Sequence, residues 1–201
     1  MAITNGYCTL AEAKSALGIT DSADDTLVEG LVTAASRLVD GYTERFFFSQ
    51  TQTRYFTAQD AFNCPVSDLV SVTTLATDDS ADDSYDQIWA ATDYQLDPAN
   101  AALESPPRPY QLLTSPMWSS RIFPEVVPQG VKVIGVWGWS AVPEAIKQAT
   151  ILLTTTLYAS RGAPFGVLGT SDGAVFRLSS RLHPAAVALM EPYRRRTGVA
   201  R

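Results

Sequence analysis

The clearest periodic pattern in the sequence lies between residues 22 and 45. Apolar positions recur there at helical spacing in two adjacent stripes, of which one is Leu27, Leu31, Ala34, Leu38 and Tyr42 and the other is Val28, Val32, Ala35 and Val39. A stripe with a period of 3.6 residues predicts an amphipathic helix. Two stripes side by side indicate a helix that is contacted on more than one side.

Three further stretches also have helical signals. Thr9 and Glu12 have the spacing of a capping box, which predicts a short helix that stops near Gly18. Pro143 suits the first turn of a helix that runs to about residue 158. A last helix is expected from about Pro184, after a glycine-rich loop over residues 161–180 with a short strand at 174–178.

Between the helical ends the period of the apolar positions changes to two. Such alternation predicts strands, and the candidates are residues 50–56, 69–77, 87–90, 94–96, 110–113 and 131–139. Asn63, Cys64 and Pro65 have the composition of a turn before the second candidate. Gly135 and Gly138 predict a bulge or bend in the last one.

These elements predict an α+β fold. We expect a mainly helical core of about four helices, formed by residues 1–48 and 141–201, with a central antiparallel β region inserted at residues 49–140. One domain over residues 1–201, with the β region as an excursion, fits the pattern better than two independent domains.

Composition narrows the class of protein. The 201 residues are 46% hydrophobic and 18% charged, which is typical of a globular chain, and no apolar run is long enough to span a membrane. The start of the chain lacks the features of a secretory signal. We therefore expect folding in a cytoplasm without a membrane partner.

Charge is divided unevenly along the sequence. Residues 1–100 carry 16 Asp and Glu against 4 Lys and Arg, whereas residues 101–201 carry 5 against 11. The acidic half argues against wrapping of nucleic acid, which needs a cationic face. The division suits a subunit that meets different partners at its two ends, although solvated acidic loops beside a basic tail explain it equally well.

Residues for chemistry are scarce. His183 is the only histidine, and Cys8 and Cys64 lie far apart in sequence, so neither a catalytic triad nor a clustered metal site is indicated. The acidic stretch 78–86 lacks the glycine and glutamate of a calcium-binding loop, and the glycines of the 161–180 loop lack the lysine of a phosphate loop. We predict no enzyme activity, no cofactor and no metal.

Two other functions stay open at this point. Trp118, Trp137 and Trp139 could form a platform for a carbohydrate or another ligand on the β segment, although packing in a core explains Trp137 and Trp139 better. A pair of carboxylates could serve an acid/base hydrolase, but the sequence singles out no pair.

Two segments resemble bacteriophage head–tail connector (adaptor) proteins. The first reads YCTLAEAKSALGITDSADDTLVEGLVTAASRLVDGYTERFF, in which a short Leu-x-x-Ala-Lys helix, an acidic turn and a long Ala- and Leu-rich helix follow one another. The second reads VPEAIKQATILLTTTLYASRG, and the closing LMEPYRR is similar to the family's last helix. The resemblance covers residues 7–48 and 140–196, and the β insertion is only loosely comparable.

The resemblance implies a structural role in the neck of a tailed-phage virion, after assembly in the host cytoplasm. Connectors of this family form a ring, usually of twelve subunits, which docks on the portal protein around the DNA channel and carries the tail or a stopper protein. Such a ring encloses DNA without sequence-specific binding. Contacts with the portal or a neighbouring subunit are expected at Arg161, Arg177, Arg181, Tyr193, Arg194, Arg195 and Arg196.

Overall fold

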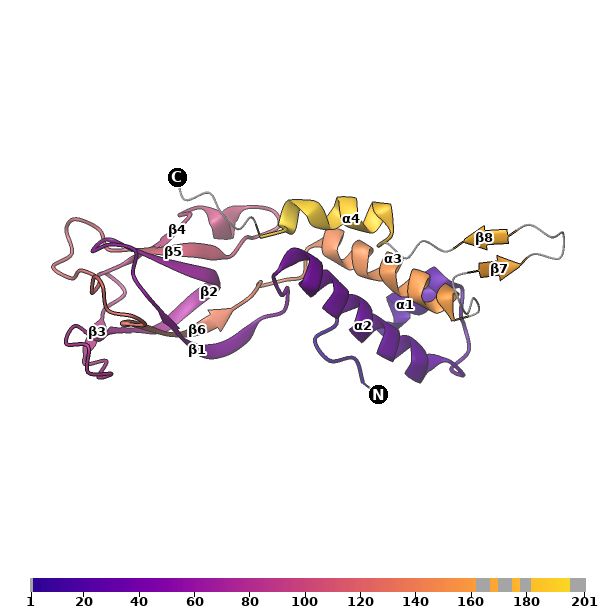
Figure 1. Cartoon of the computed structure of the whole chain (residues 1–201), viewed down its shortest axis with the longest axis horizontal. Coiled ribbons are helices and arrows are strands. Elements are labelled where there is room, and N and C mark those ends of the chain that lie inside the picture. The colour runs from indigo at the N-terminus through magenta and orange to yellow at the C-terminus, as the bar shows by residue number, and fades with distance from the viewer. Residues whose placement is uncertain (1, 162–166, 170–174, 178–181, 196–201) are drawn as a thin grey trace. The chain divides into compact units, whose positions relative to one another are not determined.

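The chain forms two compact units in a computed structural model, which describes residues 2–161, 167–169, 175–177 and 182–195 (Figure 1). The helical unit consists of Met1–Phe46 and Val142–Arg201, and the β unit consists of Phe47–Ala141. The α+β prediction is confirmed. The expectation of a mainly helical core is wrong, because the β unit buries a core of its own. The prediction of one domain over the whole chain stays a prediction.

Four α-helices build the helical unit within the described residues: α1 (Leu10–Leu17), α2 (Asp25–Thr43), α3 (Glu144–Ser160) and α4 (Pro184–Met190). The predicted capping box of α1 is present. The Thr9 hydroxyl accepts from the Glu12 backbone N–H at 3.2 Å, and the Glu12 carboxylate accepts from the Thr9 backbone N–H at 2.7 Å. Gly18, with a φ of 69°, ends the helix as its left-handed cap.

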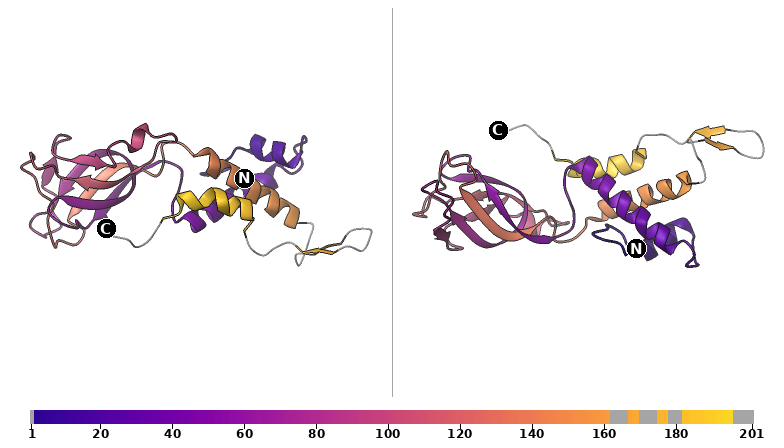
Figure 2. Two further views of the ribbon diagram at one scale, coloured as in Figure 1. Left: turned by 90° about the horizontal axis from the view of Figure 1, so that it is seen from above. Right: turned by 60° about the horizontal axis from the view of Figure 1, so that its bottom comes forward.

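Helix α2 packs against α1, α3 and α4, as the views in Figures 1 and 2 show. Its inward stripe is Val28, Val32, Ala35 and Val39, all fully buried. The N-terminal segment lies against the same helix, because the Tyr7 backbone N–H donates to the buried Ser36 hydroxyl at 3.1 Å. Tyr7 also donates its phenolic hydroxyl to the Asp40 carboxylate.

Helix α3 tolerates an unusual number of threonines. β-Branched residues lose rotamer freedom in helices, yet Thr150 and Thr154 are fully buried there. Their hydroxyls donate to the carbonyls of Ile146 and Thr150 one turn earlier, at 2.9 and 2.8 Å. Because both buried hydroxyls are hydrogen-bonded, burying them carries no penalty for an unpaired polar group. The packing of these side chains can then offset their weak preference for helix.

The β unit contains a six-stranded antiparallel sheet: β1 (Gln50–Phe56), β2 (Asn63–Thr77), β3 (Gln87–Trp89), β4 (Gln95–Asp97), β5 (Tyr110–Thr114) and β6 (Val131–Trp137). Its order is β1-β6-β2-β5-β4, with β3 paired to β2. A short 3-10 helix, η1 (Ala101–Leu103), connects β4 to β5. The sheet encloses a core that contains Leu69, Leu113 and Trp137.

Strand β2 differs from the prediction at its start. The expected turn at Asn63, Cys64 and Pro65 is wrong, because Cys64 and Pro65 pair with Leu113 and Leu112 of β5. The pairing register shifts after Pro65, and a proline without an N–H is tolerated at such an irregularity.

The predicted irregularity in the last strand is present. The β2–β6 pairing shifts register on both sides of Gly135, which pairs with Val72, and Gly138 has a φ of 101° just after β6. A Cβ on Gly135 would lie 2.2 Å from the Ser71 carbonyl oxygen, so this position has room only for glycine.

The acidic loop and the glycine-rich loop of the sequence analysis both contain ordered local structure. The acidic loop after β2 is organised by Asp78, whose buried carboxylate accepts the backbone N–H groups of Ser80, Asp82 and Asp83. These bonds hold the pKa of Asp78 below its usual range, against the opposing effect of desolvation.

The predicted strand at 174–178 is present as β8 (Val175–Arg177), which pairs with β7 (Val167–Gly169), while the rest of that loop lies outside the described residues.

Candidate assembly surface on the helical unit

The side chains that could carry chemistry have structural roles. His183 precedes α4, and its Nδ1 accepts from the Ala185 backbone N–H at 3.3 Å. Burial raises the pKa of the Cys8 thiol to about 11 and that of Cys64 to about 12, so both remain protonated at neutral pH. In the part of the chain that the structure describes, no three His, Cys, Asp or Glu side chains gather as metal ligands.

The outward stripe of α2 is an incompletely covered apolar feature, and it holds the one large hydrophobic side chain that is exposed among the described residues of the helical unit. Leu27, Leu31 and Tyr42 are half-buried, Ala34 is exposed, and Leu38 is 40% exposed. This stripe lies directly beside the fully buried one, and its direction is therefore fixed by the core. Helix α2 can thus offer an apolar surface to another molecule without rearranging.

The N-terminal end of α2 carries the first predicted interface arginine. The Tyr158 hydroxyl donates to Asp24 Oδ2 at 2.5 Å, and Arg161 Nη1 lies 3.4 Å from the same oxygen. The Arg161 guanidinium also stacks 4.5 Å above the Tyr158 ring. The hydrogen bond from Tyr158, assisted by Arg161, lowers the pKa of Asp24 below its ordinary value.

The C-terminal end of α2 carries the second group. Tyr42 donates its hydroxyl to Glu191 Oε2 at 2.5 Å, which raises the pKa of Tyr42, and the Arg194 guanidinium lies 5.5 Å from the Tyr42 ring centre. The Arg195 backbone N–H donates to the Thr43 carbonyl at 2.8 Å. The segment after α4 is thereby fastened to the end of α2.

The predicted interface arginines therefore form two groups and not one. Arg161 and Arg194 contact opposite ends of α2, and a helix of 19 residues spans about 28 Å at 1.5 Å per residue. Tyr193 is half-buried beside the second group. The side chains of Arg177, Arg181 and Arg196 lie outside the described residues. Sequence reasoning found the arginines but missed the Tyr158–Asp24 and Tyr42–Glu191 hydrogen bonds, because each joins residues more than 130 positions apart.

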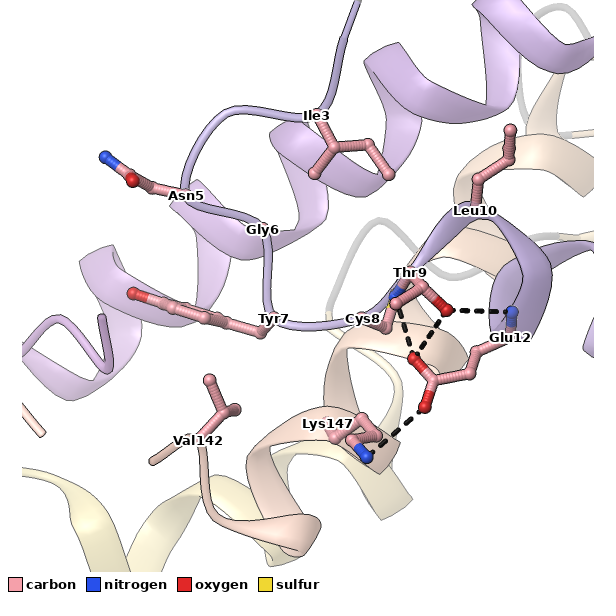
Figure 3. A pocket seen from close by; sticks show the side chains of 10 residues that line it. All are labelled: Ile3, Asn5, Gly6, Tyr7, Cys8, Thr9, Leu10, Glu12, Val142 and Lys147. Carbon is pink, nitrogen blue, oxygen red and sulfur yellow. Dashed lines mark hydrogen bonds and ion pairs between the residues drawn. The ribbon is translucent and has the colours of Figure 1, made fainter. Parts of the chain in front are cut away.

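A groove of about 620 Å³ runs between the N-terminal segment and the start of α3 (Figure 3). Ile3, Leu10 and Val142 contribute apolar side chains to it, and Lys147 lies at its edge. Lys147 Nζ is 3.2 Å from Glu12 Oε1 and 3.3 Å from Glu144 Oε2, and hydrogen bonds to these carboxylates raise its pKa. The charge of Lys147 at the edge of the groove is therefore already paired with these two carboxylates.

Two of the three tryptophans proposed for a carbohydrate platform are buried and cannot contact a ligand. Trp137 is fully buried and donates its indole N–H to the Gln52 carbonyl at 2.9 Å, and Trp139 is buried against Phe47 with ring centres 5.3 Å apart. Only Trp118, 74% exposed, could meet a ligand face on. One exposed ring does not make a stacking platform.

The charge asymmetry follows the two units. The β unit carries eleven Asp and Glu against four Lys and Arg, whereas the helical unit carries ten against eleven. The acidic character of the chain is therefore a property of the β unit. Among the helices of the described residues, none is long and apolar enough to cross a membrane.

Solved structures share this fold. A chain in the "Neck of empty GTA particle computed with C6 symmetry" matches with a TM-score of 0.60 at 19% identity, covering 100% of this chain and 95% of that chain. Chains in the neck of the native GTA particle, computed with C12 symmetry, and in the virion of the native gene transfer agent (GTA) particle match with a TM-score of 0.57 at 22% identity and the same coverage. At these identities the likeness shows the fold alone. No curated protein matches the sequence.

A family of structural connectors also matches part of the sequence. The family described as "Phage gp6-like head-tail connector protein" matches residues 7–88. The matched region extends from the N-terminal segment through α1 and α2 to β3. The resemblance to head–tail connectors is thereby confirmed for the first segment, and the second segment lies outside the matched residues.

Proposed function

We propose that this protein is the ring-forming connector subunit of a tailed-phage or phage-like particle. The ring docks on the portal around the DNA channel and links it to the tail or to a stopper protein. The observation that carries the proposal is the connector-family match over residues 7–88. The C6 and C12 symmetries of the necks that contain its structural neighbours support a ring, and twelve copies are proposed.

The outward stripe of α2 is proposed as one side of the contact between neighbouring subunits. A cyclic ring uses heterologous interfaces, in which each copy donates one surface and receives with another. A stable contact of this kind buries on the order of 800 Å² per partner. The half-covered stripe around Leu31 and Leu38 supplies an apolar centre for such an interface, and the Arg161 and Arg194 groups lie at its two ends.

The arginines after α4 are proposed to meet the portal or a neighbouring subunit. Arg194 and Arg195 are held on the end of α2, and Arg196 follows them in sequence. The acidic β unit supports passage of DNA without adhesion, since carboxylates offer phosphates no partner. Location in the virion neck follows from the same proposal.

The test is the oligomeric state of Leu38→Arg against that of Thr26→Arg. Both variants add one arginine to α2, but Thr26 is exposed on the side away from both apolar stripes. Mass photometry should show a ring for the unaltered protein and for T26R, and smaller species for L38R. Electron microscopy with purified portal protein should show docked rings.

A strictly monomeric protein that does not bind the portal would refute the proposal. Rings of L38R as stable as those of the unaltered protein would instead refute the role of the α2 stripe. Replacing Arg194, Arg195 and Arg196 together by glutamate should weaken portal docking, and unchanged docking removes those residues from the interface.

A further inference from the structure

Exposed apolar side chains are concentrated on the β unit. Of the nine large hydrophobic side chains that are exposed among the described residues, all but Leu38 belong to it. Four of them come from two neighbouring loops and form what we call the apolar tip: Phe62 (46% exposed), Met117 (94%), Trp118 (74%) and Ile122 (57%). A contiguous group of exposed apolar side chains marks an interaction site.

Backbone hydrogen bonds hold together the two loops that carry the apolar tip. The Ser115 backbone N–H donates to the Phe62 carbonyl at 2.8 Å, and the Phe123 backbone N–H donates to the Ala61 carbonyl at 2.9 Å, so the two loops lie side by side. Ser115 is buried and donates its hydroxyl to the Arg121 carbonyl.

Phe123 anchors the C-terminal end of the second tip loop in the core of the β unit. It is 1% exposed and stacks on Trp89 with ring centres 4.6 Å apart. Between these two anchors the side chains of Met117, Trp118 and Ile122 are exposed. Their loop is therefore held before any partner arrives, and a held aromatic side chain loses little conformational entropy on binding.

We propose that the apolar tip docks into an apolar pocket, rimmed by Lys and Arg, on a protein of the particle other than another copy of this chain. The inference rests on the proposed ring function. Copies related by rotation about one axis carry their tips at one level along that axis, so all tips are presented together to a second component. Pairing of tip with tip is disfavoured because Asp60 and Glu125 lie beside each tip. A ring of many such tips gains avidity even when each contact is weak.

Charge favours a protein with a cationic rim over a lipid surface. Asp60 accepts from the Phe62 backbone N–H at 2.8 Å, and Glu125 is exposed just beyond the tip. With eleven acidic against four basic side chains, the β unit is repelled by an anionic bilayer. The same charges are attracted to a basic rim around an apolar pocket, which fits the usual anatomy of an interface.

The experiment compares Met117→Ser/Trp118→Ser with Leu103→Ser. Leu103 is 82% exposed but lies in η1, at the opposite end of β5 from the tip loop. Each protein is tested for ring formation by mass photometry, and then for binding to the purified portal and to the purified next neck protein of the same particle. The tip variant should form normal rings and lose roughly 30-fold in affinity for one of these two partners, as loss of an interface hot spot does. L103S should bind like the unaltered protein.

The outcomes separate this inference from the ring proposal. Unaltered protein that forms no ring overturns the ring function itself. Normal rings together with unchanged binding of the tip variant to both partners overturn only the docking role, and so does loss of the ring in the tip variant. Binding to phosphatidylcholine–phosphatidylglycerol vesicles that depends on Trp118 would replace the protein partner by a lipid surface. A matching thermal unfolding curve for both variants shows that the fold is intact.

Discussion

Gly135 in β6 offers a sharp test of the packing in the β unit. An alanine Cβ at this position would lie 2.2 Å from the Ser71 carbonyl oxygen, well inside the 3.0 Å that real Cβ atoms respect. Relief requires the Ser71 carbonyl oxygen and the added Cβ to move apart by about 0.8 Å to reach 3.0 Å, and the clashing atom belongs to the backbone, which cannot rotate away. Overpacking costs about 1–3 kcal/mol, and we take the upper end for Gly135→Ala because a strand must move.

The assay can follow the β unit by itself. Trp89, Trp118, Trp137 and Trp139 are the only tryptophans in the sequence, and all four belong to this unit. Urea unfolding monitored by tryptophan fluorescence therefore reports its free energy of unfolding. A loss of about 3 kcal/mol lowers the midpoint by about 1–3 M at the usual dependence on urea.

The control is the same chemical change where space is open. Gly41 is exposed in α2, and an added Cβ meets nothing within 4 Å. Gly41→Ala should stabilise the helical unit by up to about 1 kcal/mol, seen by far-ultraviolet circular dichroism. A G135A protein whose fluorescence midpoint corresponds to a loss below about 0.5 kcal/mol would refute the reasoning about the β2–β6 contact.

Two further changes test the helical unit. Thr9→Ala removes the capping box and should lower the free energy of unfolding by about 1 kcal/mol, measured by thermal unfolding followed by circular dichroism. Thr9→Ser keeps the hydroxyl and should leave the stability near that of the unaltered protein. Equal losses of stability in both variants would contradict the capping role. Asp24→Asn tests the pH dependence: because the Tyr158 hydrogen bond lowers the pKa of Asp24 in the folded state, its contribution is present at neutral pH and is lost as the pH falls through that lowered pKa. Urea midpoints at pH 7 and pH 3 should differ less in D24N than in the unaltered protein, and an equal difference would show that Asp24 contributes nothing.

Local signals predicted most of the secondary structure. The capping box at Thr9, the two stripes of α2 and the alternation in β1 and β6 each arise from contacts close in sequence, which a periodic pattern records. The start of β2 was missed because Pro65 usually marks a turn, and only pairing with β5 shows that a register shift accommodates it.

The candidate surfaces were less accessible to sequence reasoning. The arginines at 161 and 194 looked alike as exposed cations, and their placement at opposite ends of α2 depends on contacts with Asp24 and Tyr42, far away in sequence. The sequence singled out Trp118 only as one member of a possible carbohydrate platform. The exposure of Trp118 depends on the burial of Ser115 and Phe123 on either side of it, and no local sequence pattern predicts that burial.

The pairing of β1 with β6 has a consequence for how such proteins can diversify. Gln50 at the start of β1 pairs with Trp137 at the end of β6, so the first and last strands of the inserted unit are held about one strand spacing, ~4.8 Å, apart near the points where the chain enters and leaves it. The chain therefore leaves and returns at one place. An insertion with adjacent ends adds little loop-closure entropy to its host, so this segment can lengthen, shrink or be exchanged as a cassette while the helices keep their sequence and their partners.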